Sequence, residues 1–468
     1  MVAFWSLFWG QGSPFMQNTL STGYPRLLRL LHEFFTKIAV HTDTVYTHQH
    51  QSPETVLVLR AIQPFEQLYL NRSTNRLADA VVSAFAGPSS LSASFSGRSA
   101  AMPSASEGVA TARAIVNELD AARFDPLLVK AVARGAARAV ETYVAKAEGL
   151  VARDHGATSL LGPLATPSQH ANAELAGSLY HLWAPLHRAL PGHNEPTREL
   201  LGPAVERVRA AYLSIADPLL AAIRREVSAL LGRMHRVDYS RDADPAGANP
   251  LVAGANSSSA YMAELADKLA LVRDEVLGPF RVGELAREWA LDLARLAARL
   301  FVLHASLVSP MGELGKLKLT QDATALEFAL SQGVAQHGLS LAALGDPFRA
   351  LRAFRPMLFL ALAELTDGAR TGALPELVVL HHALSRGGLR LPHQARGWSE
   401  TEYVRWLGEE GEAAGVAVVK EIVGEWERER ERADEGEGEQ GQGEAEPQAE
   451  AAKVVNAILE GSREELSK

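Results

Sequence analysis

Residues 320–365 decide the fold class of this chain and read TQDATALEFALSQGVAQHGLSLAALGDPFRALRAFRPMLFLALAEL. Leu326, Leu330 and Val334 recur every four residues, so they fall on one face of a helix. The stretch contains no grouping of acids, histidines or hydroxyls that a catalytic site requires. It predicts two or three helices that serve as a scaffold.

Helix starts can be predicted from capping residues. Thr320 is an N-cap type, and Asp322 would then lie in the first turn, where the positive end of the helix dipole favours an acid. Asp-Pro pairs at 125–126, 217–218 and 346–347 predict further starts, because aspartate caps and proline suits the first helical position. We therefore expect helices to begin at these four places.

Apolar periodicity of three and four residues recurs along the chain, and no stretch shows the alternation of a strand. The cleanest helix follows Asp125. The fold class is therefore all-α, built from helical bundles. The apolar positions that carry the pattern in this helix are Val129, Val132, Ala136, Val140, Tyr143, Ala147 and Leu150.

The first helix begins at Pro25. Leu27, Leu31, Phe34 and Ile38 form a stripe that we expect to be buried. Further apolar residues lie off this stripe, so other parts of the fold, an upstream region or another chain must cover them. They are Leu28, Leu30 and Phe35.

Composition limits the classes of function. The chain has 468 residues, no cysteine and a net charge of −9. Residues 425–450 hold eleven acids and three arginines, so the rest of the chain is close to neutral and gives no electrostatic reason to expect a nucleic-acid partner. No apolar run reaches the length of a bilayer span, and MVAFWSLFWG at the start is too short and lacks a preceding positive charge. Any membrane contact is expected to be peripheral.

Loose segments suggest the domain boundaries. Ser, Gly and Pro make up twelve of the 21 residues of 86–106, which predicts a flexible loop. The predicted organisation is an irregular, mis-started N-terminus (1–24), a middle bundle containing that loop (25–238), a flexible connection (239–259), a C-terminal bundle (260–424) and an acidic, mostly disordered tail (425–468).

Three short motifs resemble functional sites but favour structural interpretations. Gly436, Gly438 and Gly441 spell GxGxxG in an acidic tail that would repel phosphate, without the strand that a dinucleotide site needs. The histidines and acid of 41–50 are spread too far along a helix for one zinc ion. His304 is expected to be a hydrogen-bonded core residue, and the adjacent pair at 381–382 diverges too widely to share a metal. We predict no catalytic, cofactor-binding or metal-binding residues, and no enzymatic activity.

Longer segments carry a more specific signal. They include HEFFTKIAVHTDTVYT (32–47), SPETVLVLRAIQPFEQLYLNRSTNRL (52–77), FVLHASLVSPMGELGKLKLTQDATALEFALSQ (301–332) and GWSETEYVRW (397–406). Together with intervening matches over about residues 25–424, they resemble the family of the fifth subunit of the conserved oligomeric Golgi complex. Two features depart from the family: its N-terminal helical region is absent, and the loops 86–106 and 239–259 look like fungal-style insertions.

The resemblance implies an elongated rod of stacked helical bundles and a non-catalytic role. It implies a subunit of a peripheral Golgi tethering complex that acts in retrograde vesicle transport between cisternae. The implied partners are the other subunits, most directly the seventh, with SNARE proteins and Rab GTPases as further candidates. The alternative is a helical adaptor or scaffold outside vesicle traffic, which would show the same periodicity.

Overall fold

The computed structural model describes residues 14–42, 53–86, 102–240, 258–435 and 442–466. Within these ranges the regular structure is entirely helical, without a strand. The predicted all-α class is confirmed.

The chain forms two compact units, and the division between them falls within one long helix, α8. Unit 1 comprises residues 1–159, 166–219 and 279–282. Unit 2 comprises residues 160–165, 220–278 and 283–468. The helices up to the division are α2 (Pro14–Thr22), α3 (Tyr24–His41), α4 (Pro53–Ala86), α5 (Ala105–Ala122), α6 (Pro126–Glu148), η2 (His155–Thr158), α7 (Pro167–Ala189), η3 (Leu190–Gly192) and α8 (Glu195–Gly232).

Unit 1 is built around α6, whose start confirms the Asp-Pro prediction. The Asp125 side chain accepts hydrogen bonds from the backbone amides of Leu127 and Leu128. The predicted apolar positions from Val129 to Ala147 are all buried. Beside α6, α5 approaches α7 so closely that a Cβ on Gly108 would lie 2.2 Å from the carbonyl oxygen of Ser178. Only glycine fits there.

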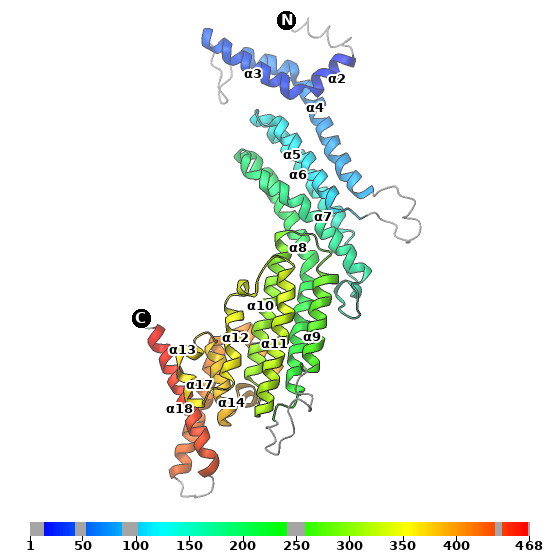
Figure 1. Ribbon diagram of the computed structural model, residues 1–468. Coiled ribbons are helices and arrows are strands. Elements are labelled where there is room, and N and C mark those ends of the chain that lie inside the picture. Colours follow the sequence, from blue (N-terminus) through cyan, green and yellow to red (C-terminus); the bar gives the residue numbers. More distant parts are fainter. Residues whose placement is uncertain (1–13, 43–52, 87–101, 241–257, 436–441, 467–468) are drawn as a thin grey trace. The chain divides into compact units, whose positions relative to one another are not determined.

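Unit 2 packs α9, α10 and α11 side by side, with α12 and α14 against α10 (Figure 1). Leu326, Leu330 and Val334 are buried, as the sequence predicts. The elements after α8 are η4 (Arg233–Arg236), α9 (Ala260–Leu271), η5 (Val272–Val276), α10 (Glu284–Ser306), α11 (Glu313–Ala335), η6 (Leu341–Leu344), α12 (Asp346–Met357), η7 (Leu362–Thr366), α13 (Gly368–Thr371), α14 (Glu376–Gly387), α15 (Pro392–Arg396), α16 (Glu400–Glu410), α17 (Glu412–Glu435) and α18 (Gln442–Leu466).

Two predicted helix starts are wrong. Helix α11 begins at Glu313, so Thr320 lies inside it, and Asp322 is a fully buried residue rather than a first-turn acid. Helix α8 continues through Pro218, although proline lacks the backbone donor of a helix interior. Apolar residues such as Ile215 and Ile223 are buried on both sides of this proline, and their packing outweighs the lost hydrogen bond.

The N-terminal prediction needs a correction. Residues 1–13 lie outside the described residues, but 14–22 form helix α2 rather than irregular chain. Helix α2 is fixed to α4 because the Arg72 guanidinium donates hydrogen bonds to the Asn18 side chain and the Thr22 hydroxyl.

The acidic tail also differs from the prediction. Residues 436–441 lie outside the described residues, but α18 packs against α14 and buries Ala451 and Val455 completely. A Cβ on Gly387 would lie 2.1 Å from that of Ala451, so the two helices meet at a point where one side chain is missing. Although the tail is acidic overall, it contains a short apolar stripe, and this stripe packs against α14.

The predicted flexible connection lies mostly outside the described residues. Its segment 241–257 is not described, whereas Tyr239 and Ser259 at its ends are buried within unit 2. The compact units divide near residue 219, ahead of this connection. A boundary at 239–259 therefore remains a proposal.

Candidate interaction surfaces

Helix α3 leaves much of its apolar surface exposed. Leu30 is 55% exposed, Phe34 54% and Val40 75%. The buried positions are instead Tyr24, Leu28 and Phe35. Burial is therefore rotated around the helix: two residues off the predicted stripe are covered, and Phe34 within that stripe is open to solvent.

Polar contacts at two points set this rotation. The ring of Tyr24 lies 6.0 Å from that of Tyr69 on α4, and its hydroxyl donates to the Glu66 carboxylate at 3.4 Å. Burial, followed by the nearby Glu66, raises the pKa of Tyr24. On the same helix, His32 Nε2 lies 2.9 Å from an Asp125 carboxylate oxygen. These contacts hold the side of α3 that carries Tyr24 and His32 against α4 and the start of α6.

The hydrogen bond from His32 also affects the electrostatics of Asp125. Burial opposes ionisation of this carboxyl, but hydrogen bonds from His32 and from two backbone amides outweigh burial. The pKa of Asp125 consequently lies below its usual value. A charged Asp125 therefore serves both as the cap of α6 and as the anchor of α3.

Unit 2 contains a cleft of about 840 Å³ between α10, α12, α14, α16 and the start of α17. Its walls are largely apolar, with four charged side chains among them. The cleft can bind apolar groups, and its lining residues include no histidine, serine or cysteine. The main apolar lining residues are Leu303, Leu374, Leu377, Val404 and Leu407, and the charged ones are Arg299, Asp346, Arg349 and Glu412.

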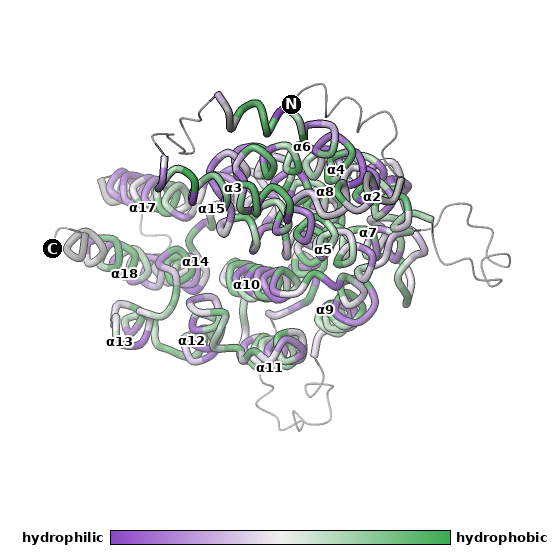
Figure 2. The backbone as a smooth tube through the Cα atoms, turned by 90° about the horizontal axis from the view of Figure 1, so that it is seen from above, coloured by the Kyte–Doolittle hydropathy of each residue, from purple (hydrophilic) through white to green (hydrophobic). Residues whose placement is uncertain are grey.

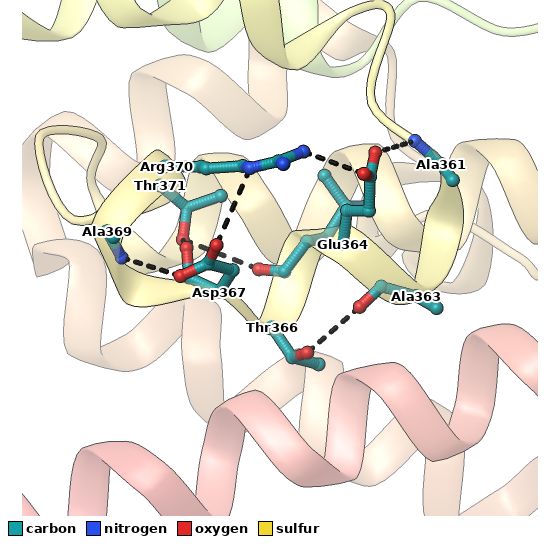
Figure 3. A network of polar contacts seen from close by, with 9 residues as sticks. Ala361, Ala363, Glu364, Thr366, Asp367, Ala369, Arg370 and Thr371 are labelled. Atoms are coloured by element: carbon teal, nitrogen blue, oxygen red, sulfur yellow. Dashed lines mark hydrogen bonds and ion pairs between the residues drawn. The ribbon is translucent and has the colours of Figure 1, made fainter.

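A surface network fixes the turn that leads into this cleft (Figure 3). The Glu364 carboxylate accepts from the Ala361 amide at 2.8 Å and from Arg370 at 2.7 Å. These two hydrogen bonds hold the pKa of Glu364 below its usual range. Asp367 caps α13 by accepting from the Ala369 amide. The network orients η7 and α13, so that the following residues 372–375 form one wall of the cleft.

Asp322 is the most deeply buried acid among the described residues of unit 2, and its contacts are structural. Its carboxylate accepts from the Ser259 amide at 2.7 Å and from the Tyr261 hydroxyl at 2.9 Å, and Tyr239 lies 3.4 Å away. Burial raises the pKa of Asp322 despite these donors. The chain also passes close by, since a Cβ on Gly315 would lie 2.1 Å from the Tyr239 carbonyl oxygen. Asp322 therefore joins α11 to both ends of the segment 241–257.

Several histidines of unit 2 are core residues. His304 is 1% exposed and lies 3.0 Å from His235, which confirms the predicted hydrogen-bonded core histidine. His381 contacts the Ser306 and Tyr403 hydroxyls at 3.2 and 3.0 Å. Neighbouring His382 is equally buried, yet neither ring nitrogen has a hydrogen-bond partner among the described residues. Burial lowers the pKa of His304, His381 and His382 to about 3.

The remaining motifs do not form a site in the described part of the chain. His41 ends α3, whereas residues 43–50 of the histidine-rich segment and all three glycines of the GxGxxG motif lie outside the described residues. Among the described residues, no group of three or more histidines and acids is close enough to hold a metal ion. Within the same ranges, no helix is long and apolar enough to cross a membrane.

Comparison with known proteins agrees with the segments quoted above. The chain is 26% identical over 428 residues to the conserved oligomeric Golgi complex subunit 5 of Mus musculus. The chain resembles the fifth subunit of this Golgi complex. The protein of the same name from Arabidopsis thaliana is 26% identical over 415 residues, and that from Drosophila melanogaster 25% identical over 306. No protein-family model matches the chain.

The similarity covers most of this chain but only about half of the mouse and Arabidopsis relatives. The matches to the mouse and Arabidopsis subunits cover 84% and 86% of this chain but 49% and 47% of those relatives. The chain thus spans about half the length of the curated relatives that it matches. The resemblance was detectable from the long segments, and the excess of apolar residues on α3 was detectable from their spacing. The sequence did not indicate which of these residues are exposed, and it gave no signal for the cleft.

Proposed function

We propose that this protein is a non-catalytic subunit of a Golgi vesicle-tethering complex and acts in retrograde transport between Golgi cisternae. The observation that carries the proposal is the similarity to the fifth subunit over more than four-fifths of the chain in two of the three relatives. The all-helical fold is compatible with this role, because helical bundles offer long surfaces for binding other helices.

The proposed partners are other subunits of the same complex, most directly the seventh, with SNARE proteins and Rab GTPases as further partners. The proposed location is the cytosolic face of Golgi membranes, reached by peripheral attachment. The protein would work through binding alone, without a cofactor or metal ion.

A tagged copy in the native cell tests the proposal. The expected result is co-purification of the other tethering subunits and overlap with a Golgi marker by microscopy. Recovery of the tagged chain without any of those subunits, away from the Golgi marker, would contradict it and favour a helical adaptor outside vesicle traffic.

A further inference from the structure

Among the described residues, α8 is the only helix that continues from one compact unit into the other, and it carries a proline at that point. The division falls between Leu219 and Leu220, directly after Pro218. We propose that α8 is a hinge, which bends at Asp217 and Pro218 so that the two units change their relative orientation. The inference concerns the chain itself and does not rest on the proposed function.

The backbone hydrogen bonds of α8 are interrupted at this point. Pro218 has no backbone N–H, so the Ser214 carbonyl oxygen lacks the donor that the residue four positions later normally supplies. The Ser214 hydroxyl donates to the Ala211 carbonyl oxygen at 2.8 Å, and a serine that bonds back to the preceding turn often bends a helix. Ser214, Asp217 and Pro218 are all exposed. Water therefore has access to this turn, and opening it would leave no buried carbonyl group unsatisfied.

The same point contains a helix start that the continuous helix does not use. Aspartate followed by proline suits the start of a helix, because the carboxylate accepts from free amides of the first turn and proline needs no hydrogen bond there. In the continuous helix, the Asp217 carboxylate has no hydrogen bond or ion pair among the described residues. In a bent α8 it would cap the half that begins at Pro218, as Asp125 caps α6. The bent helix thus gains a cap in exchange for the hydrogen bonds of one turn.

The packing of α8 is divided at the same place. Ile215 and Ala216 are buried before the division and belong to unit 1, whereas Leu220 and Ile223 are buried after it and belong to unit 2. In both units the helices mix hydrophobic and hydrophilic residues, as expected of helices with one buried face (Figure 2). Each half of α8 is therefore held by its own unit, and a bend between the halves preserves both sets of contacts.

The other connections across the division are loops that contain or adjoin glycine. Residues 160–165 belong to unit 2 and include Gly162, whose φ is 105°. Residues 279–282 belong to unit 1 and lie between Gly278 and Gly283, and the φ of Gly283 is 55°. Because glycine adopts backbone conformations that other residues avoid, these loops can follow a rotation that a helix would resist.

Distances between spin labels test the hinge in the purified full chain. The chain has no cysteine, so introduced cysteines are the only labelled positions. Two pairs join exposed residues of unit 1 to one of unit 2: R138C/F328C and E174C/F328C. A bend of about 20°, which is typical of a proline kink, moves a point about 25 Å from the hinge by about 9 Å. Double electron–electron resonance should therefore give a distance distribution up to about 9 Å broader for at least one of these pairs than for R138C/E174C within unit 1.

Variants of α8 locate the bend. P218A restores the missing donor and should narrow the distribution across the division to the width of the pair within unit 1. D217A keeps the proline but removes the cap, so it should narrow the distribution in part. Pro203 supplies the matched control, because it also lies inside α8 but within unit 1. P203A should keep the wild-type width.

Circular dichroism checks that each variant is folded, which is expected because all three substituted residues of α8 are exposed. Two results would overturn the inference. One is a wild-type chain in which neither pair across the division is broader than the pair within unit 1. The other is equal widths in P218A and P203A. Neither result decides complex membership, which the co-purification experiment tests separately.

Discussion

The buried histidines predict that unit 2 loses stability when the solution is mildly acidified. His304, His381 and His382 are at most 1% exposed, and burial holds the pKa of each near 3. In the unfolded chain their pKa returns to about 6.5. Below that value the unfolded chain binds protons that the folded protein does not, so stability is present at neutral pH and is lost as the pH falls from about 6.5 towards 3.

The size of the effect follows from the linkage relation. Between pH 7.5 and pH 5, each such histidine costs about 2 kcal/mol of folding free energy, or about 6 kcal/mol for the three together. Domains are commonly stable by about 5–15 kcal/mol, so this loss is comparable to the whole stability of the unit.

Urea denaturation of the full chain at several pH values measures the loss, with tryptophan fluorescence as the probe. The variant H382L should reduce the loss of stability between pH 7.5 and pH 5 by about 2 kcal/mol, which is the contribution of one such histidine. The substitution breaks no side-chain hydrogen bond, because neither ring nitrogen has a partner among the described residues. It should be no less stable than the wild type at pH 7.5. Replacing the exposed His170 by glutamine is the control and should keep the full dependence. Equal urea midpoints at pH 7.5 and pH 5 would refute the reasoning, and so would an unchanged slope in H382L.

Three further predictions concern the same unit. Burial raises the pKa of Asp322, so the contribution of this carboxyl to the free energy of unfolding falls as the pH rises through that pKa. D322N should therefore flatten the urea-derived stability profile in that pH range. An unchanged profile would mean that another group titrates there. G387V should lower the melting temperature by displacing α18, as should ending the chain at residue 441, and melting curves identical to the wild type would mean that α18 adds no stability. F354A should lower the unfolding free energy by about 2–5 kcal/mol, because Phe354 is fully buried. F348A should lower it by about 1 kcal/mol or less, because Phe348 is only half-buried beside Arg352. Equal unfolding free energies of the two variants would contradict this ranking.

The sequence predicts burial well where the apolar residues of a helix are confined to one face. The stripe of α6 from Val129 to Ala147 is buried as expected, because its apolar residues are confined to one side. Helix α3 is apolar over about half of its circumference, so periodicity cannot choose which part is covered. The choice depends on Tyr24 and His32, whose partners Glu66 and Asp125 are distant in the sequence.

Composition misled the prediction for the tail in a similar way. Five acids between 425 and 450 lie exposed in the described part of the tail, namely Glu425, Glu429, Glu431, Glu446 and Glu450. The packing is made instead by Ala451, Val454, Val455 and Leu459, which are buried. This small stripe packs against Gly387, where the lack of a side chain leaves room for Ala451. Gly387 lies 64 residues before Ala451 in the sequence. The cleft of unit 2 could not be predicted at all, because five helices contribute to its walls.

The contacts of Asp322 have a practical consequence for engineering this protein. Tyr239 and Ser259 are both held beside one carboxylate, and the Gly312 amide also donates to the Tyr239 carbonyl oxygen at 2.8 Å. The positions of Tyr239 and Ser259 are thus set by contacts that do not involve residues 241–257. Closing a longer loop between fixed ends adds only about 0.6 kcal/mol for each doubling of its length. This segment is therefore the place to insert an affinity tag or a fluorescent protein that reports on the intact chain while both termini stay unmodified.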